Sequence, residues 1–213
     1  MKHLRNYKRR AKLIYSVFSG MKVIDALSDF AFYETGAVKL PVPCEDHIED
    51  FVGKVPELWT YFCCGQDKNY APNRFVSMPS VRNRILGTLL YKYDVKGFLQ
   101  WGYNFYNLQY SVKPIDPYVV TDAGGSFPSG DSFMVYPSCK GEALASLRFK
   151  VFYDGFQDMM ALQTLENIIG REKVLEFLLN ESVKPLSFTE YPRSSEWLLE
   201  TREKINAKIK ENI

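Results

Sequence analysis

The sequence predicts an α/β fold with about four short parallel strands joined by helices, followed by further helices. At 213 residues with 46% hydrophobic side chains, the chain is long enough to bury one sizeable core. Short apolar runs of strand length alternate with stretches whose apolar residues recur at the helical period. Strands that alternate with helices in this way are typical of βαβ units, in which the strands lie parallel.

The first part of the chain supplies most of this alternation. Ser28 is expected to cap a short helix that ends before Gly36, because these residue types are favoured at the two ends of a helix. The elements expected here are a helix over 2–18, a strand over 21–27, a helix over 28–36, a strand over 39–44 and a strand over 57–64.

The remainder of the chain is predicted to be mainly helical. Arg148 is expected to pair with Asp154 or Asp158 on the longest helix. We expect a main domain over residues 1–170 and a helical extension over 171–213. The elements expected are an amphipathic helix in the second half of 74–94, a fourth strand over 96–105, a loop over 107–141, a helix from Glu142 to about Ile169, and helices around 171–180 and 194–210.

Polar and aromatic residues follow or end each predicted strand. Asp25 closes the first, Glu45-Asp46-His47 follow the second, Trp59 and Tyr61 sit in the third, and Trp101, Tyr103 and Asn104 finish the fourth. In a (β/α)₈ barrel the active site lies at the carboxyl ends of the strands, so these endings favour part of such a barrel over a small open sheet. A whole barrel has ~250 residues and eight strands. The sequence therefore predicts half of a TIM-type barrel, whose open edges would pair with a missing half or with a second copy.

Composition argues against several classes of partner. A formal net charge of +2 gives no long-range field to attract nucleic acid, and no apolar run approaches the ~20 residues of a membrane span. Basic residues between Lys2 and Lys12 are interpreted as a solvated helix face. We expect a cytoplasmic protein with reduced thiols, and neither a metal nor another cofactor. The cysteines, which lack metal-ligand spacing, are Cys44, Cys63, Cys64 and Cys139.

An aromatic stretch, GFLQWGYNFYNLQY at 97–110, raises the possibility of a sugar site. Sugars present apolar C–H faces ringed by hydroxyls, so a site that binds them combines flat aromatic rings with amides and carboxylates. Asp131 could aim a carboxylate at sugar hydroxyls or could be a plain turn residue, and the aromatic residues could serve packing instead. The residues that we expect to contact substrate are Asp25, Trp59, Tyr61, Trp101, Asn104 and Asp131.

Long colinear segments resemble a known enzyme family, from the first residues to about Glu166. They read GMKVIDALSDFAFYETG, LWTYFCCGQ, PNRFVSMPSVRNRILGTLLYKYDVKGFLQWGYNFYN, FPSGDSFMVYP and SLRFKVFYDGFQD. These segments are similar to the C-terminal part of the catalytic domain of family 123 glycoside hydrolases, which carries a (β/α)₈-type barrel. The resemblance implies that the predicted half barrel is the C-terminal half.

The resemblance implies removal of terminal β-linked N-acetylhexosamine, notably N-acetylgalactosamine, from a glycan or glycoside. The family mechanism is substrate-assisted, with an adjacent Asp-Glu pair that orients the acetamide and protonates the leaving oxygen. The first acidic residue here is Asp25 and no such pair precedes it, so we expect the pair upstream of Met1 and assign no catalytic residue. The alternatives are a non-catalytic carbohydrate-binding module and a half barrel that pairs with itself.

Overall fold

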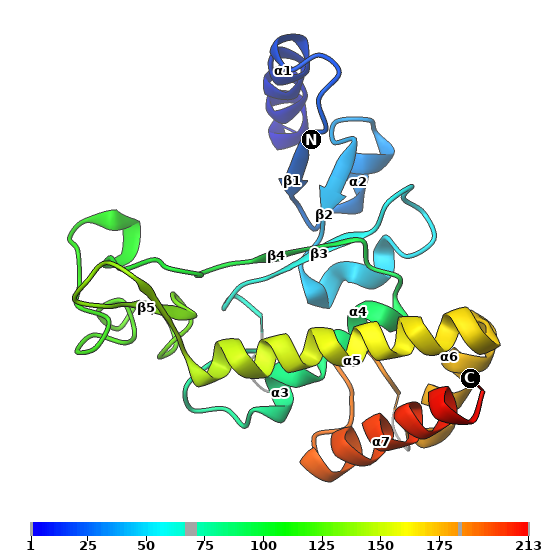
Figure 1. The fold of residues 1–213 in the computed structure, drawn as a ribbon. Helices are drawn as coiled ribbons and strands as arrows, with labels where there is room; N and C mark the ends of the chain where they lie inside the picture. The colour runs from blue at the N-terminus through cyan, green and yellow to red at the C-terminus, as the bar shows by residue number, and fades with distance from the viewer. Residues whose placement is uncertain (1, 67–71, 183–184, 213) are drawn as a thin grey trace. The chain divides into compact units, whose positions relative to one another are not determined.

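The structure is a computed structural model that describes residues 2–66, 72–182 and 185–212 (Figure 1). The end of the polar stretch after the third predicted strand, residues 67–71, therefore lies outside the described residues. The chain divides into two compact units. Unit 1 runs to Phe62 and includes Val95–Leu99, whereas unit 2 comprises Cys63–Asp94 and the chain from Gln100 onward.

Unit 1 contains the alternating strands and helices that the sequence predicts. Its strands are shorter than predicted. The elements are α1 (Lys2–Val17), β1 (Ile24–Ala26), α2 (Phe30–Glu34), β2 (Leu40–Val42), the 3₁₀ helix η1 (Glu45–Asp50), β3 (Trp59–Phe62) and β4 (Gly97–Gln100).

Strands that follow one another in the sequence of unit 1 are also neighbours in space. β1 pairs with β2 in parallel, with Asp25 opposite Pro41. A parallel bridge between Cys44 and Tyr61 joins the end of β2 to β3, and β3 pairs with β4. β2 is buried throughout, whereas β1 is exposed at every residue. The predicted α/β class is confirmed.

The cap of α2 differs from the prediction. Asp29, not Ser28, is the N-cap, and its Oδ1 accepts a hydrogen bond from the Ala31 amide at 3.0 Å. Ser28 instead accepts a hydrogen bond from the Cys44 amide at 2.9 Å through its Oγ. Serine and aspartate can both cap a helix. Here the Ser28 hydroxyl is bound by the Cys44 amide, which lies beyond β2, and Asp29 caps the helix.

Unit 2 is mainly helical. The predicted start at Glu142 is wrong, because residues 143–145 form a strand and Ser146 caps the longest helix through a bond from the Phe149 amide. The elements are α3 (Val81–Arg84), α4 (Leu86–Lys92), the 3₁₀ helix η2 (Gln109–Ser111), β5 (Val135–Pro137), β6 (Ala143–Ala145), α5 (Leu147–Ile169), α6 (Arg171–Glu181) and α7 (Ser195–Glu211).

α4 and α5 pack closely because both carry a glycine at their contact. A Cβ placed on Gly87 would lie 1.7 Å from the carbonyl oxygen of Gly155, which no side chain can tolerate. Leu89, Leu162 and Leu165 are fully buried. Among the described residues, no helix is long and apolar enough to cross a membrane.

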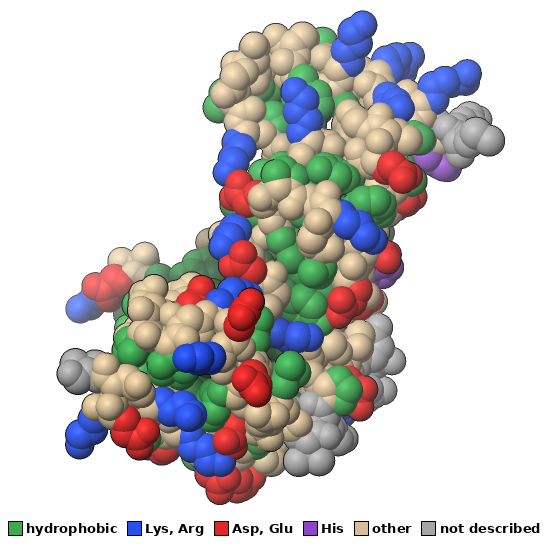
Figure 2. All heavy atoms as spheres, turned by 90° about the vertical axis from the view of Figure 1, so that its right-hand side faces the viewer, with side chains coloured by type: hydrophobic (Ala, Val, Ile, Leu, Met, Phe, Trp, Pro, Cys, Tyr) green, Lys and Arg blue, Asp and Glu red, His purple; other side chains and the backbone are tan. Residues whose placement is uncertain are grey.

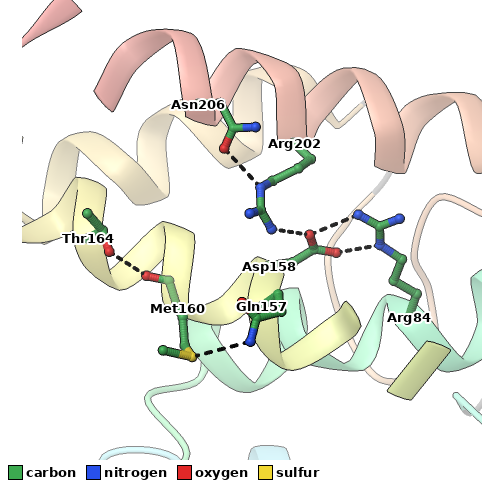
Figure 3. Close-up of polar contacts among 7 residues, drawn as sticks. All are labelled: Arg84, Gln157, Asp158, Met160, Thr164, Arg202 and Asn206. Carbon is green, nitrogen blue, oxygen red and sulfur yellow. Dashed lines mark hydrogen bonds and ion pairs between the residues drawn. The ribbon is translucent and has the colours of Figure 1, made fainter. Parts of the chain in front are cut away.

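A buried carboxylate ties three helices of unit 2 together (Figure 3). Asp158 on α5 accepts hydrogen bonds from Arg84 Nε at 2.7 Å and Nη2 at 3.0 Å, and from Arg202 Nη1 at 2.8 Å. Arg84 lies on α3 and Arg202 lies on α7. The expected pairing of Arg148 with Asp154 or Asp158 is not what the structure has, because these two arginines occupy Asp158.

Replacing Asp158 with alanine is expected to lower the free energy of unfolding by about 3 kcal/mol, because two arginines would lose their buried counter-charge. The Asp158 side chain is 5% exposed. Chemical denaturation followed by circular dichroism measures the change. Asp154→Ala removes an exposed carboxylate from the preceding turn of the same helix and should cost less than ~1 kcal/mol. Equal losses in the two variants would contradict a special role for Asp158.

Candidate functional site

The structure brings Trp101 and Asp131 into direct contact. The Trp101 indole Nε1 donates a hydrogen bond to Asp131 Oδ2 at 2.7 Å. The indole is half-buried and lies against two phenylalanine rings, with centroid distances of 5.4 Å to Phe105 and 5.5 Å to Phe127. Asp131 itself is 2% exposed. One edge of the Trp101 ring is thus fixed by a buried carboxylate while part of the ring stays accessible.

A sharp bend at Gly102 places Trp101 over this loop. Gly102 has a φ of +70°, and a Cβ on it would lie 2.2 Å from the Asp131 carbonyl oxygen. The predicted strand over 96–105 is therefore interrupted, and the strand proper ends at Gln100. Beyond the bend the chain pairs antiparallel with the segment after Asp131, through a bridge between Asn104 and Phe133. Asn104 is exposed beside the Trp101 bend.

Arg148, at the start of α5, holds the Asp131 loop in place. Its Nη1 donates to the carbonyls of Gly130 at 2.5 Å and Arg74 at 2.8 Å, and its Nη2 donates to the carbonyl of Phe133 at 2.8 Å. A guanidinium offers five donors in a fixed plane, so one side chain can bind several carbonyls at once. Gly130, with a φ of +81°, lets the loop approach this guanidinium closely.

Burial raises the pKa of both acidic groups at this site, the Asp131 carboxyl and the Cys64 thiol. Burial raises the pKa of Asp131, against the opposing effects of hydrogen bonds from Trp101 and Cys64 and of the charges of Arg74 and Arg148. Burial first, and then the charge and hydrogen bond of Asp131, raise the pKa of the Cys64 thiol to about 12. Cys64 is therefore a thiol at neutral pH and is not a nucleophile.

Asp25, Trp59 and Tyr61, the other three residues predicted to contact substrate, belong to unit 1. Asp25 is exposed on β1, and its Oδ2 accepts a hydrogen bond from the Tyr7 hydroxyl. Burial, followed by the hydrogen bond and charge of Asp25, raises the pKa of Tyr7. A phenol–carboxylate pair of this kind fixes the position of Asp25 relative to α1.

Trp59 and Tyr61 are held by neighbouring strands of unit 1. The Trp59 ring lies on the backbone of β4, since a Cβ on Gly97 would come within 2.2 Å of it. Its Nε1 donates to Glu57 Oε1 at 2.9 Å. The backbone amide of Tyr61 donates to the Pro43 carbonyl at 3.0 Å. Both residues thus contribute to the pairing of β3 with its neighbours.

The arrangement in unit 2 suits ligand binding better than bond making. It offers a partly exposed indole that a buried carboxylate holds by its Nε1 edge, and the exposed Asn104 lies three residues along the chain. Sequence reasoning missed Cys64 and Arg74, and it gave Arg148 the wrong partners. The glycine in FPSGDSF was the available signal, because a left-handed glycine before a buried aspartate indicates close packing against another segment. No cluster of three or more metal-ligating side chains occurs among the described residues.

Comparison with known proteins identifies a family for most of the chain. Residues 2–165 match the family described as Glycoside hydrolase 123, catalytic domain. The match covers both the α/β part of unit 1 and the loop that carries Asp131, and it confirms the resemblance seen in the sequence. No curated protein matches the chain.

Gly102→Ala is expected to destabilise the chain by about 2 kcal/mol more than Gly125→Ala. Both glycines have positive φ, so both variants carry the ~1 kcal/mol cost of a left-handed alanine. A Cβ on Gly125 meets nothing within 4 Å, whereas one on Gly102 collides with the backbone at Asp131. Denaturation midpoints and the near-ultraviolet circular dichroism of tryptophan measure the difference. Equal stability of the Gly102→Ala and Gly125→Ala variants would show that the Asp131 loop does not contact Gly102 closely.

Proposed function

Because the chain belongs to the glycoside hydrolase 123 family, we propose that it serves the hydrolysis of terminal β-linked N-acetylhexosamine, N-acetylgalactosamine in particular. The substrate is a glycan or glycoside with this sugar at its non-reducing end. The observation that carries the proposal is the indole of Trp101, which the Asp131 carboxylate holds in one orientation, with the exposed Asn104 three residues along the chain. A fixed aromatic face with an adjacent amide fits a sugar ring.

The proposed chemistry uses the acetamide of the substrate itself. The acetamide oxygen attacks the anomeric carbon as the bond to the leaving oxygen breaks, and a general acid protonates that oxygen. Water then opens the oxazolinium intermediate, so the anomeric configuration is retained. The sequence contains no Asp-Glu dipeptide, so the proposal assigns neither the general acid nor the acetamide-orienting carboxylate to these residues.

Within this scheme, Trp101 forms the platform for the sugar and Asn104 hydrogen bonds its hydroxyls. Asp131 acts through Trp101, because its Oδ2 accepts the indole hydrogen bond and the residue is 2% exposed. Direct contact of Asp131 with sugar hydroxyls stays a prediction, as do the contacts proposed for Asp25, Trp59 and Tyr61. Arg148 positions the loop through the carbonyls of Gly130 and Phe133.

We also propose that unit 1 is the strand-bearing part of the C-terminal half of a (β/α)₈ barrel. The parallel pairing of β1 with β2 and the parallel bridge from Cys44 to Tyr61 support this, because barrel strands follow one another in sequence order. The proposed domain ends near residue 170, and 171–213 form a helical extension. The exposed strand β1 would pair with a further half barrel or with a second copy.

A non-catalytic carbohydrate-binding role is the second candidate. The observation that favours it is the same absence of an Asp-Glu dipeptide from the sequence. Such a module would keep the Trp101 platform and bind the sugar without cleaving it. The two candidates share the binding site and differ only in turnover.

Trp101→Ala is expected to weaken binding of N-acetylgalactosamine by about 2 kcal/mol, through loss of stacking and apolar contact. Isothermal titration calorimetry measures the affinity, and circular dichroism checks the fold. Trp197→Ala is the matched control. Its indole Nε1 donates to the Glu181 carbonyl at 2.7 Å, away from the Asp131 loop, so sugar affinity should not change.

Two outcomes would contradict the proposal. If the folded wild-type chain does not bind N-acetylgalactosamine, or if folded Trp101→Ala binds it as tightly, the platform assignment is wrong. Turnover of an aryl β-N-acetylgalactosaminide, assayed in parallel, separates the two candidate functions. Turnover that depends on a carboxylate of this chain would show that the chain does supply a catalytic acid.

A further inference from the structure

Unit 1 carries a strongly basic surface on α1. The helix sequence, KHLRNYKRRAKLIYSV, contains six Lys and Arg residues and neither Asp nor Glu. Figure 2 shows Lys and Arg side chains gathered at the α1 end of this unit. The exposed members on α1 are Arg5, Lys8, Arg9, Arg10 and Lys12. Lys8 and Lys12 are one helical turn apart and therefore lie on the same side of the helix.

Two pockets adjoin this surface and share Tyr15 as a wall. One, of about 320 Å³, is lined by Lys8 and Lys12 together with the chain after α2. The other, of about 310 Å³, is lined by Lys22 and Lys39. We call these two pockets, with Lys8, Lys12, Tyr15, Lys22 and Lys39, the lysine groove.

Lys39 is fixed at the wall between the pockets. Its backbone amide donates to the Tyr15 hydroxyl at 3.1 Å, and its ammonium lies 4.6 Å from the centroid of the Tyr15 ring. A cation over an aromatic face is held without loss of its charge. The Lys39 ammonium is thus positioned in the groove by the same residue that separates the two pockets.

The groove carries more positive charge than its own acids neutralise. Glu57 is the acidic residue that lines it, and its Oε2 pairs with Lys22 Nζ at 2.5 Å. Glu57 Oε1 also accepts the Trp59 indole hydrogen bond, so both oxygens of this carboxylate already have a partner. Among the described residues, Lys8, Lys12 and Lys39 form no ion pair. Three ammonium groups therefore remain for a ligand.

We propose that the lysine groove binds an acidic oligosaccharide, whose sulfate or carboxylate groups meet Lys8, Lys12 and Lys39. Two adjoining pockets separated by one ring suit a ligand of repeated units, each with an anionic group. The family membership makes a glycan the expected macromolecule. Every cation of the groove is a lysine, whereas bidentate recognition of nucleic-acid phosphates favours arginine. The groove binds its ligand independently of the Trp101 site.

The test measures binding of the full chain to a chondroitin sulfate tetrasaccharide, to its desulfated counterpart, and to a short DNA duplex at the same ionic strength. Lys8→Gln/Lys12→Gln should weaken tetrasaccharide binding about tenfold, as expected for two exposed ion contacts. Lys39→Gln should weaken it as well. Tight binding of the sulfated form alone identifies sulfate as the recognised group, and equal binding of both forms identifies the carboxylate.

The control variant, Lys140→Gln/Lys150→Gln, removes the same charge from exposed positions of unit 2. It should leave binding unchanged. The proposal is overturned if the wild-type chain does not bind the tetrasaccharide, if Lys8→Gln/Lys12→Gln binds it as tightly, or if the control loses as much affinity. Tighter binding of the DNA duplex than of the tetrasaccharide would identify the groove as a nucleic-acid site instead.

Discussion

The guanidinium of Arg148 is the interaction on which the candidate site depends. It binds the carbonyls of Gly130 and Phe133, on either side of Asp131, and also that of Arg74 from a distant part of the chain. The loop is thereby anchored to the start of α5, with the Asp131 carboxylate directed at the Trp101 indole. Because the loop is fixed at both sides, the orientation of Trp101 follows from the helical framework rather than from the loop alone.

The helical framework has its own electrostatic centre. Asp158 receives arginines from two other helices, and the contact between Gly87 and Gly155 lets α4 lie directly on α5. α5 therefore links the Asp131 loop to the helical framework, because its first turn carries Arg148 and its middle carries Asp158. Membership of the glycoside hydrolase 123 family indicates the class of reaction. The helical framework explains how the Trp101 ring is held in a fixed position. A rigid ring loses little entropy when a sugar binds.

Local patterns in the sequence predicted most of the helices and strands. The predictions failed where contacts between distant parts of the chain determine the structure. The helical periods of α1 and α5 and the glycine after α2 are local, and each led to the right element. The bend at Gly102 was not predictable, because it depends on the backbone of Asp131 some thirty residues away. For the same reason Arg148 was assigned to carboxylates on its own helix, whereas its acceptors are carbonyls of other segments. The contact of Cys64 with Asp131 left no local signal in the sequence.

The proposed function depends on Trp101, held by Asp131, as the platform for the sugar. A crystal structure of the chain soaked with N-acetylgalactosamine tests it most directly. We expect the sugar ring to stack on the exposed face of Trp101, with the Asn104 amide within hydrogen-bond distance of a hydroxyl. Sugar bound elsewhere, with the Trp101 face empty, would contradict it.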